Sequence, residues 1–193
     1  MTAPTLILAS SSPRRRELLA KMGVQFEIVA ADVEEHMPST TEDARALAKH
    51  NATLKAQAVA RMRPGRWVLG SDTIVVSDGR VLGKPPTLEA ASEYLAALSG
   101  RTHEVVTGCC LIDPDPEERP LEVSDVSRVT FHELSKQTIE KYLAAVHVLD
   151  KAGAYALQEH GDWIIERVDG SRDNVLGLPT ERLRSVFIRR DLV

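Results

Sequence analysis

Three consecutive arginines, Arg14, Arg15 and Arg16, stand where the sequence predicts the first turn of a helix. Ser12 suits the N-cap of that helix and Pro13 its first position. The N-terminus of a helix already carries partial positive charge, so guanidinium groups there are unfavourable unless an anion offsets them. Free backbone N–H groups and arginine side chains both bind phosphate oxygens. We therefore interpret this turn as a phosphate-binding site, with a solvated basic turn as the alternative.

Two acidic positions suit a metal ion beside such a phosphate site. Asp72 lies inside the apolar run 67–76, where a charged residue is costly to bury unless it is paired or bound to a metal. Glu35 ends the acidic segment 32–35. Carboxylates near bound phosphate are typical of a magnesium site, because Mg²⁺ binds a few carboxylates together with substrate oxygens. The alternatives are an Asp on the solvent face of a sheet and a loop that only adds solubility.

Other polar residues gain importance next to a phosphate site. Lys84 stands between Gly83 and Pro85, so it projects from a stiff turn. Lys55 lies in an alanine-rich helical segment, where a solvated helix face is the default interpretation. Gln158 both donates and accepts hydrogen bonds, as recognition of a nucleobase requires.

Composition and charge exclude several classes of function. The chain has 193 residues, and 43% of them are hydrophobic, which suits one ordinary domain with a sizeable core. A net charge of −4 argues against a general nucleic-acid binder. No run approaches the roughly 20 apolar residues of a membrane helix. Cys109 and Cys110 are adjacent within a strand pattern, so we expect buried free thiols and a cytoplasmic protein.

Strand and helix patterns alternate along the chain. Strands are predicted over 6–9, 25–29, 67–76, 81–82, 103–112, 121–131 and 163–165, and helices over 13–22, 42–61, 88–98, 136–145 and from Thr180 onward. The phase of the strand 121–131 breaks at Asp125 and Val126, which predicts a bulge. Residues 170–179 form a glycine-punctuated loop, either a backbone clamp or a connector. Hairpin and crossover connections together predict an α/β fold with a mixed sheet.

Taken together, these segments resemble the Maf family of nucleoside triphosphate pyrophosphatases. The matching segments follow the family's order and span nearly the whole chain: 8–15, Glu35, 55–56, 71–75, 83–85, 151–155 with Gln158 and Gly161, and 174–179. The resemblance implies a single Maf-like domain over residues 1–193. It also implies a two-lobed α/β mixed-sheet fold similar to the inosine triphosphate pyrophosphatases, with the active site in the central cleft. The implied reaction is hydrolysis between the α- and β-phosphates, which gives a nucleoside monophosphate and pyrophosphate.

Three positions resemble the branch of the family that acts on dTTP and UTP: Arg14, Thr73 and Gln158. The branch that acts on 7-methyl-GTP typically carries Trp, Gln and Glu there. Glu159 and His160 are bulky residues before Gly161 and depart from the family's pattern. Three alternatives stay open: a 7-methyl-GTP pyrophosphatase, an enzyme for modified pyrimidine nucleotides, and a non-enzymatic, nucleotide-binding regulator of septum formation.

The resemblance and the residue chemistry together predict a role for each site residue. Glu35 and Asp72 would hold a divalent cation, Mg²⁺ in the first place with Mn²⁺ or Co²⁺ as alternatives. Asp72 would also act as the general base on the attacking water. The substrate-binding and specificity residues would be Ser10, Arg14, Arg15, Lys55, Thr73, Lys84 and Gln158. The partner is the nucleoside triphosphate, with neither nucleic acid nor membrane, and because members of this family can be dimers a homodimer is allowed.

Overall fold

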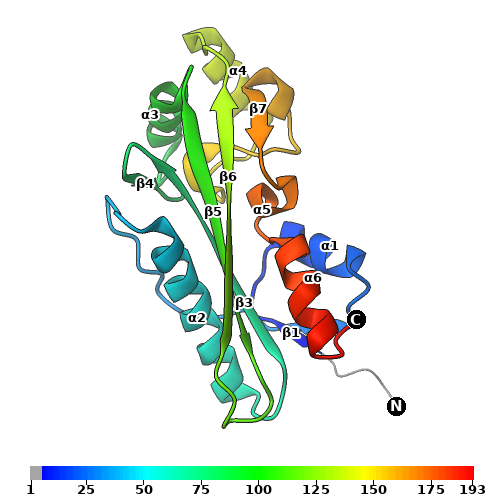
Figure 1. Cartoon of the computed structure of the whole chain (residues 1–193). Coiled ribbons are helices and arrows are strands. Elements are labelled where there is room, and N and C mark those ends of the chain that lie inside the picture. The colour runs from blue at the N-terminus through cyan, green and yellow to red at the C-terminus, as the bar shows by residue number, and fades with distance from the viewer. Residues whose placement is uncertain (1–5) are drawn as a thin grey trace.

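A seven-stranded mixed sheet forms the centre of the computed structural model, which describes residues 6–193 (Figure 1). The strands follow the order β2-β1-β3-β5-β6-β7, and β4 pairs with β3. Their bounds are β1 (Leu6–Leu8), β2 (Phe26–Ile28), β3 (Val68–Ser77), β4 (Arg80–Leu82), β5 (Thr102–Ile112), β6 (Leu121–Phe131) and β7 (Ile165–Asp169). β1 runs parallel to β2 and β3, whereas all other pairs are antiparallel. The mixed sheet predicted from the sequence is confirmed.

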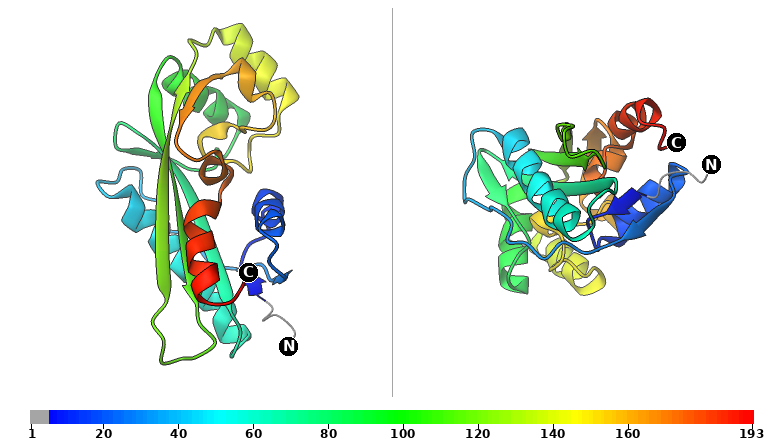
Figure 2. Two further views of the ribbon diagram at one scale, coloured as in Figure 1. Left: turned by 45° about the vertical axis from the view of Figure 1, so that its right-hand side comes forward. Right: turned by 90° about the horizontal axis from the view of Figure 1, so that it is seen from below.

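Helices cover both faces of this sheet (Figure 2). They are α1 (Pro13–Lys21), α2 (Ala44–Met62), α3 (Leu88–Leu98), α4 (Lys136–Ala145), α5 (Arg172–Leu176) and α6 (Thr180–Arg189), with 3₁₀ turns η1 (Ala152–Ala154) and η2 (Gly161–Trp163). Side chains of α2 pack with Val68 and Cys110, whereas those of α1 and α6 pack with Leu69 and Leu111. Because successive strand residues point to opposite faces, α2 lies on one face and α1 and α6 on the other.

Small residues bring α2 unusually close to the sheet. A Cβ atom on Gly70 would lie 2.1 Å from the carbonyl oxygen of Ala52, and one on Gly108 would lie 2.4 Å from the carbonyl carbon of Ala48. No side chain fits at either strand position without moving the helix backbone. The alanine-rich character of α2 therefore serves close packing as well as helix formation.

Two large apolar clusters occupy opposite ends of the sheet. One, around α3, α4 and η1, includes Leu95, Phe131 and Tyr142. The other, around β1, α1 and α6, includes Leu19 and Phe187. The middle of β3 lies between these two cores, because Val75 belongs to the first and Leu69 to the second.

Most predicted elements are confirmed, but the bulge in β6 is wrong. The register of β6 with β5 runs without interruption through Asp125 and Val126, and the irregularity lies at Thr130 and Phe131 opposite β7. Asp125 breaks the apolar alternation because its carboxylate lies 3.7 Å from the guanidinium of Arg182 on α6. An ion pair, and not an inserted residue, accounts for the break in phase.

Two further local predictions are wrong. The strand expected over 163–165 begins only at Ile165, because the preceding residues form η2 after a left-handed residue at His160. The loop 170–179 contains the short helix α5, which Ser171 caps and Gly177 ends in a left-handed conformation. Residue patterns this short carry little periodicity, so helix and strand are hard to separate.

The cysteine prediction is confirmed, since Cys109 and Cys110 are both free and buried. Burial raises the pKa of the Cys109 thiol to about 12, although the hydrogen bond between this thiol and Ser71 acts to lower the pKa. Within residues 6–193, the helices all lack the length and apolar character that crossing a bilayer demands.

Candidate active site

The site lies where β3 changes its neighbouring strand. β5 pairs along one edge of β3 from Val68 to Val76. On the other edge, β1 pairs with Val68 and Leu69, and β4 pairs with residues 75–77. In the described structure, residues 70–74 therefore have no strand beside them on that edge. The sheet has a gap there, through which residues on its two faces can meet.

A cavity of about 440 Å³ opens at this gap. Eight of the nine predicted site residues line it: Ser10, Arg14, Arg15, Glu35, Lys55, Asp72, Thr73 and Lys84. The ninth, Gln158, is exposed and outside the lining, although the adjacent Leu157 belongs to it. The structure thus brings together residues from the strand-to-helix turn, the acidic loop, α2, β3 and the turn after β4.

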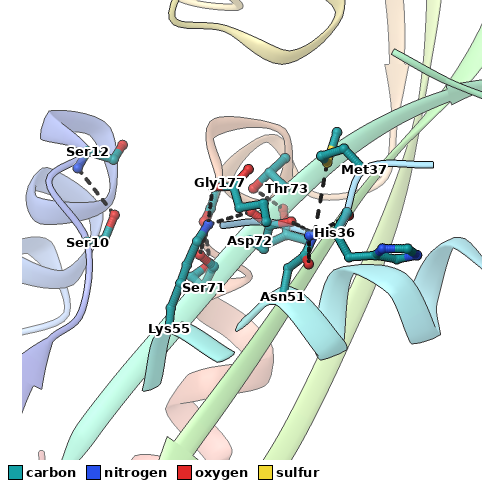
Figure 3. Close-up of polar contacts among 12 residues, drawn as sticks. Ser10, Ser12, His36, Met37, Asn51, Lys55, Ser71, Asp72, Thr73 and Gly177 are labelled. Carbon is teal, nitrogen blue, oxygen red and sulfur yellow. Dashed lines mark hydrogen bonds and ion pairs between the residues drawn. The ribbon is translucent and has the colours of Figure 1, made fainter. Parts of the chain in front are cut away.

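Lys55 joins the carboxylates of Glu35 and Asp72 on the α2 face of the sheet. Figure 3 shows its side chain beside Asp72. Its Nζ atom lies 2.6 Å from Oδ1 of Asp72 and 2.7 Å from Oε1 of Glu35. The side chains of Lys55 and Asp72 are only 10% and 5% exposed. Asp72 is therefore buried and paired, and the solvent-facing alternative for it is wrong. The default of a solvated face is wrong for Lys55 as well.

The pKa of Glu35 reflects this cationic environment. Partial burial pushes the pKa of its carboxyl upward, but the hydrogen bond and charge of Lys55 outweigh burial, with smaller contributions from Lys84 and Arg15. The net result is a pKa below the ordinary value. Glu35 is consequently ionised at neutral pH, as a metal ligand must be.

Arg15 builds the wall of the cavity on the opposite face. Its Nε donates to the carbonyl oxygen of Gly177 at 2.9 Å, its Nη1 to Ser10 Oγ at 3.2 Å and its Nη2 to Thr73 Oγ1 at 3.0 Å. Ser71 Oγ donates to the same carbonyl at 3.0 Å. Arg15 thus ties α1, β3 and the end of α5 together.

The Maf-like protein family matches residues 5–189. The chain belongs to this family. A dTTP/UTP pyrophosphatase of Akkermansia muciniphila is 46% identical over 91% of both chains, and one of Syntrophomonas wolfei is 43% identical over 95% of this chain and 96% of its own. A dTTP/UTP pyrophosphatase of Myxococcus xanthus is 45% identical over 90% of this chain and 86% of its own.

Solved structures show the same fold at low sequence identity. A HAM1 protein from Coxiella burnetii superposes with a TM-score of 0.60 at 18% identity, covering 96% of this chain and 99% of that one. The Ham1 protein of Staphylococcus aureus gives a TM-score of 0.53 at 14% identity, with the same coverage. The mixed α/β fold expected for this Maf-like protein is thereby confirmed.

Two of the three residues expected to mark the dTTP/UTP branch line the cavity, and the third does not. Arg14 and Thr73 are in the lining, whereas Gln158 lies in the exposed loop 157–160. Glu159 of that loop pairs with Lys151 at 3.4 Å. His160 stacks on the ring of Trp163 with a centroid distance of 4.1 Å. The two bulky residues noted in the sequence therefore hold the loop to its surroundings.

The segment 151–156, which is rich in small residues, also forms part of the cavity wall. Gly153 N–H donates to the carbonyl oxygen of Gly83 at 3.1 Å, which places η1 against the turn that bears Lys84. Small residues allow the backbone to approach this closely beside a pocket. Sequence reasoning did not assign a role to Lys151, whose side chain is 6% exposed and whose ammonium group pairs with Asp150 at 2.9 Å.

Sequence reasoning missed Asn51 on α2. Its side chain is fully buried and its Nδ2 lies 3.0 Å from Oδ2 of Asp72. The only signal was its position four residues before Lys55, which places both side chains on one helix face. In an alanine-rich segment that spacing does not single out one polar residue.

Proposed function

We propose that this protein is a nucleoside triphosphate pyrophosphatase that hydrolyses dTTP and UTP to the nucleoside monophosphate and inorganic diphosphate. One observation carries the proposal. In a member of the Maf-like family, cationic side chains of Arg14, Arg15 and Lys84 line the same cavity as Lys55 and its two carboxylate partners. A polyphosphate with a bound cation matches that mixture of charges.

The phosphate-binding role falls first on Arg14 and Lys84. Both line the cavity, and Lys84 is exposed. Arg15 already makes three hydrogen bonds to protein groups, so it shapes the wall and adds charge. The N-terminus of α1, capped by Ser12 and without an acidic residue in its first turn, adds its dipole at the same place.

The two carboxylates fit a divalent cation. Glu35 and Asp72 both contact one atom, Lys55 Nζ, so they converge on a single point. Among the residues of the described chain, no group of three potential ligands exists. A site of two carboxylates suits Mg²⁺, which takes its remaining ligands from water and substrate phosphates. Glu35 and Asp72 would hold the cation, which would supply positive charge against the charge of the substrate phosphates.

Asp72 is proposed as the general base. Its Oδ1 and Oδ2 accept hydrogen bonds from Lys55 and Asn51, and each carboxylate oxygen has a further lone pair. The water oxygen bonds to phosphorus, the bridging P–O bond of the α–β anhydride breaks, and the water proton passes to Asp72. The diphosphate leaves with the electron pair of the broken bond. Positioning and charge neutralisation dominate such a reaction.

Release of diphosphate from a panel of nucleoside triphosphates tests the proposal. The panel contains dTTP, UTP, CTP, ATP, GTP, 7-methyl-GTP and 5-methyl-UTP, each with Mg²⁺, Mn²⁺, Co²⁺ or chelator. We expect monophosphate and diphosphate from dTTP and UTP, and none with chelator. Preference for 7-methyl-GTP would assign the other branch. Nucleotide binding without turnover of any substrate would refute an enzymatic role.

A further inference from the structure

Asn51 connects the acidic loop to the proposed general base. Its Oδ1 accepts from the backbone N–H of His36 at 2.9 Å, and its Nδ2 donates to the carbonyl oxygen of His36 at 3.0 Å. Nδ2 also donates a hydrogen bond to Oδ2 of Asp72, with an N–O distance of 3.0 Å. Figure 3 shows Asn51 between His36 and Asp72. The amide side chain therefore matches one donor and two acceptors, which fixes its orientation.

The loop that bears Glu35 has few other restraints. It lies between β2 and α2, and its ends are held by Val29 N–H on the Leu8 carbonyl and by Val81 N–H on the Ser39 carbonyl. Among the described residues, the backbone groups of 30–38 form hydrogen bonds only at His36, and both go to Asn51. The immediate neighbour of Glu35 is thus the anchored residue.

We propose that Asn51 is a positioning residue that fixes the loop 30–38 on β3 and thereby sets the separation of the Glu35 and Asp72 carboxylates. This inference rests on the proposed function, because it assumes that these two carboxylates hold the cation. Asn51 is 0% exposed and does not line the cavity, so it acts through the groups it holds. Residues of this kind orient ligands, and their loss typically costs about 10- to 100-fold in metal affinity or activity.

Two substitutions separate the functions of the amide. Asn51→Ala removes these three hydrogen bonds and the 4.0 Å contact of Nδ2 with Met37 Sδ. Asn51→Asp keeps an acceptor for the His36 N–H but loses the donors to the His36 carbonyl and to Asp72. The matched control is Lys49→Ala on the same helix, which removes a 3.4 Å surface ion pair with Glu122 and touches no site residue.

The first measurement is independent of turnover. Hydrogen–deuterium exchange of the His36 amide should accelerate about tenfold or more in Asn51→Ala and stay unchanged in Lys49→Ala, because only Asn51 protects this amide. Binding of Mn²⁺ alone, followed by electron paramagnetic resonance of the free ion, should weaken about tenfold in both Asn51 variants. Wild-type exchange and wild-type Mn²⁺ affinity in Asn51→Ala would overturn the proposal.

The second measurement uses hydrolysis of dTTP. The Mg²⁺ concentration for half-maximal rate should rise about tenfold in both Asn51 variants, whereas KM for dTTP at saturating Mg²⁺ should change less. A purely structural role would lower the melting temperature but leave the Mg²⁺ concentration for half-maximal rate unchanged, and that result would overturn the proposal. If Asn51→Ala does not fold, the same measurements on Asn51→Asp test the proposal. If the wild type hydrolyses no nucleotide, the proposed function fails, while exchange and Mn²⁺ binding still test Asn51.

Discussion

Substitution of Gly70 by Ala tests whether close packing of α2 positions the site. The added Cβ would lie 2.1 Å from Ala52 O and 2.8 Å from Ala56 N, whereas ordinary contacts begin at 3.4 Å. Both obstacles are helix backbone, so α2 must move away from β3 by about 1 Å. Such overpacking costs about 1–3 kcal/mol, which for a chain of this size lowers the melting temperature by about 2–12 °C. Lys55 would move with the helix.

The rate of diphosphate release from dTTP, measured well below the melting temperature, reports this displacement. A shift of about 1 Å in a catalytic constellation costs about 100-fold in rate, so kcat should fall by that order. Gly161→Ala is the matched control, because its methyl group would meet its nearest neighbours at 3.5 Å. Wild-type rate and stability in Gly70→Ala would refute the idea that contact of α2 with β3 sets the site.

Three further predictions address individual side chains. Asp72→Asn should lower kcat about 10²- to 10⁴-fold with the fold retained by circular dichroism, and an unchanged kcat would remove Asp72 from the role of base. Arg14→Ala should raise KM about tenfold at constant stability, whereas Arg15→Ala should also lower the melting temperature because three internal hydrogen bonds disappear; equal melting temperatures would contradict this difference. The folded-state pKa of Glu35 is lowered, so its ionised form stabilises the fold above its unfolded pKa of about 4.3 and this contribution is lost as pH falls through the lower folded pKa. Urea unfolding at about pH 6 and about pH 3 should therefore show a smaller loss of stability in Glu35→Gln than in wild type, and an equal loss would contradict the lowered pKa.

Local signals in the sequence were sufficient to predict most elements. Ser12 caps its helix through a side-chain hydrogen bond to the backbone, as predicted, and Thr87 and Ser135 do the same, as is typical of Ser and Thr. Such caps involve residues only three positions apart, so no knowledge of the tertiary structure is needed. The phase break at Asp125 was misread for the opposite reason, since its partner Arg182 is remote in sequence.

The composition of the site was predictable, but the contacts within it were not. The types of Glu35 and Asp72 indicated metal and base chemistry without any structure. Their link through Lys55, and the anchoring of the loop by Asn51, depend on how closely α2 approaches β3. That approach depends on Gly70 meeting the backbone of α2, a contact between segments that no local pattern encodes.

Successive side chains of β3 point to opposite faces of the sheet, so the short motif 71–73 contributes residues to both faces. Asp72 points toward α2, where Lys55 and Asn51 hold its carboxylate, whereas Ser71 and Thr73 point to the opposite face, where Ser71 contacts the Gly177 carbonyl and Thr73 contacts Arg15. A slip of β3 by one residue would exchange these faces and remove the carboxylate from its cation. The uninterrupted pairing of β3 with β5 past the gap prevents that slip. The open edge at residues 70–74 can therefore admit a ligand, because continuous pairing with β5 along the other edge holds the register of the motif there.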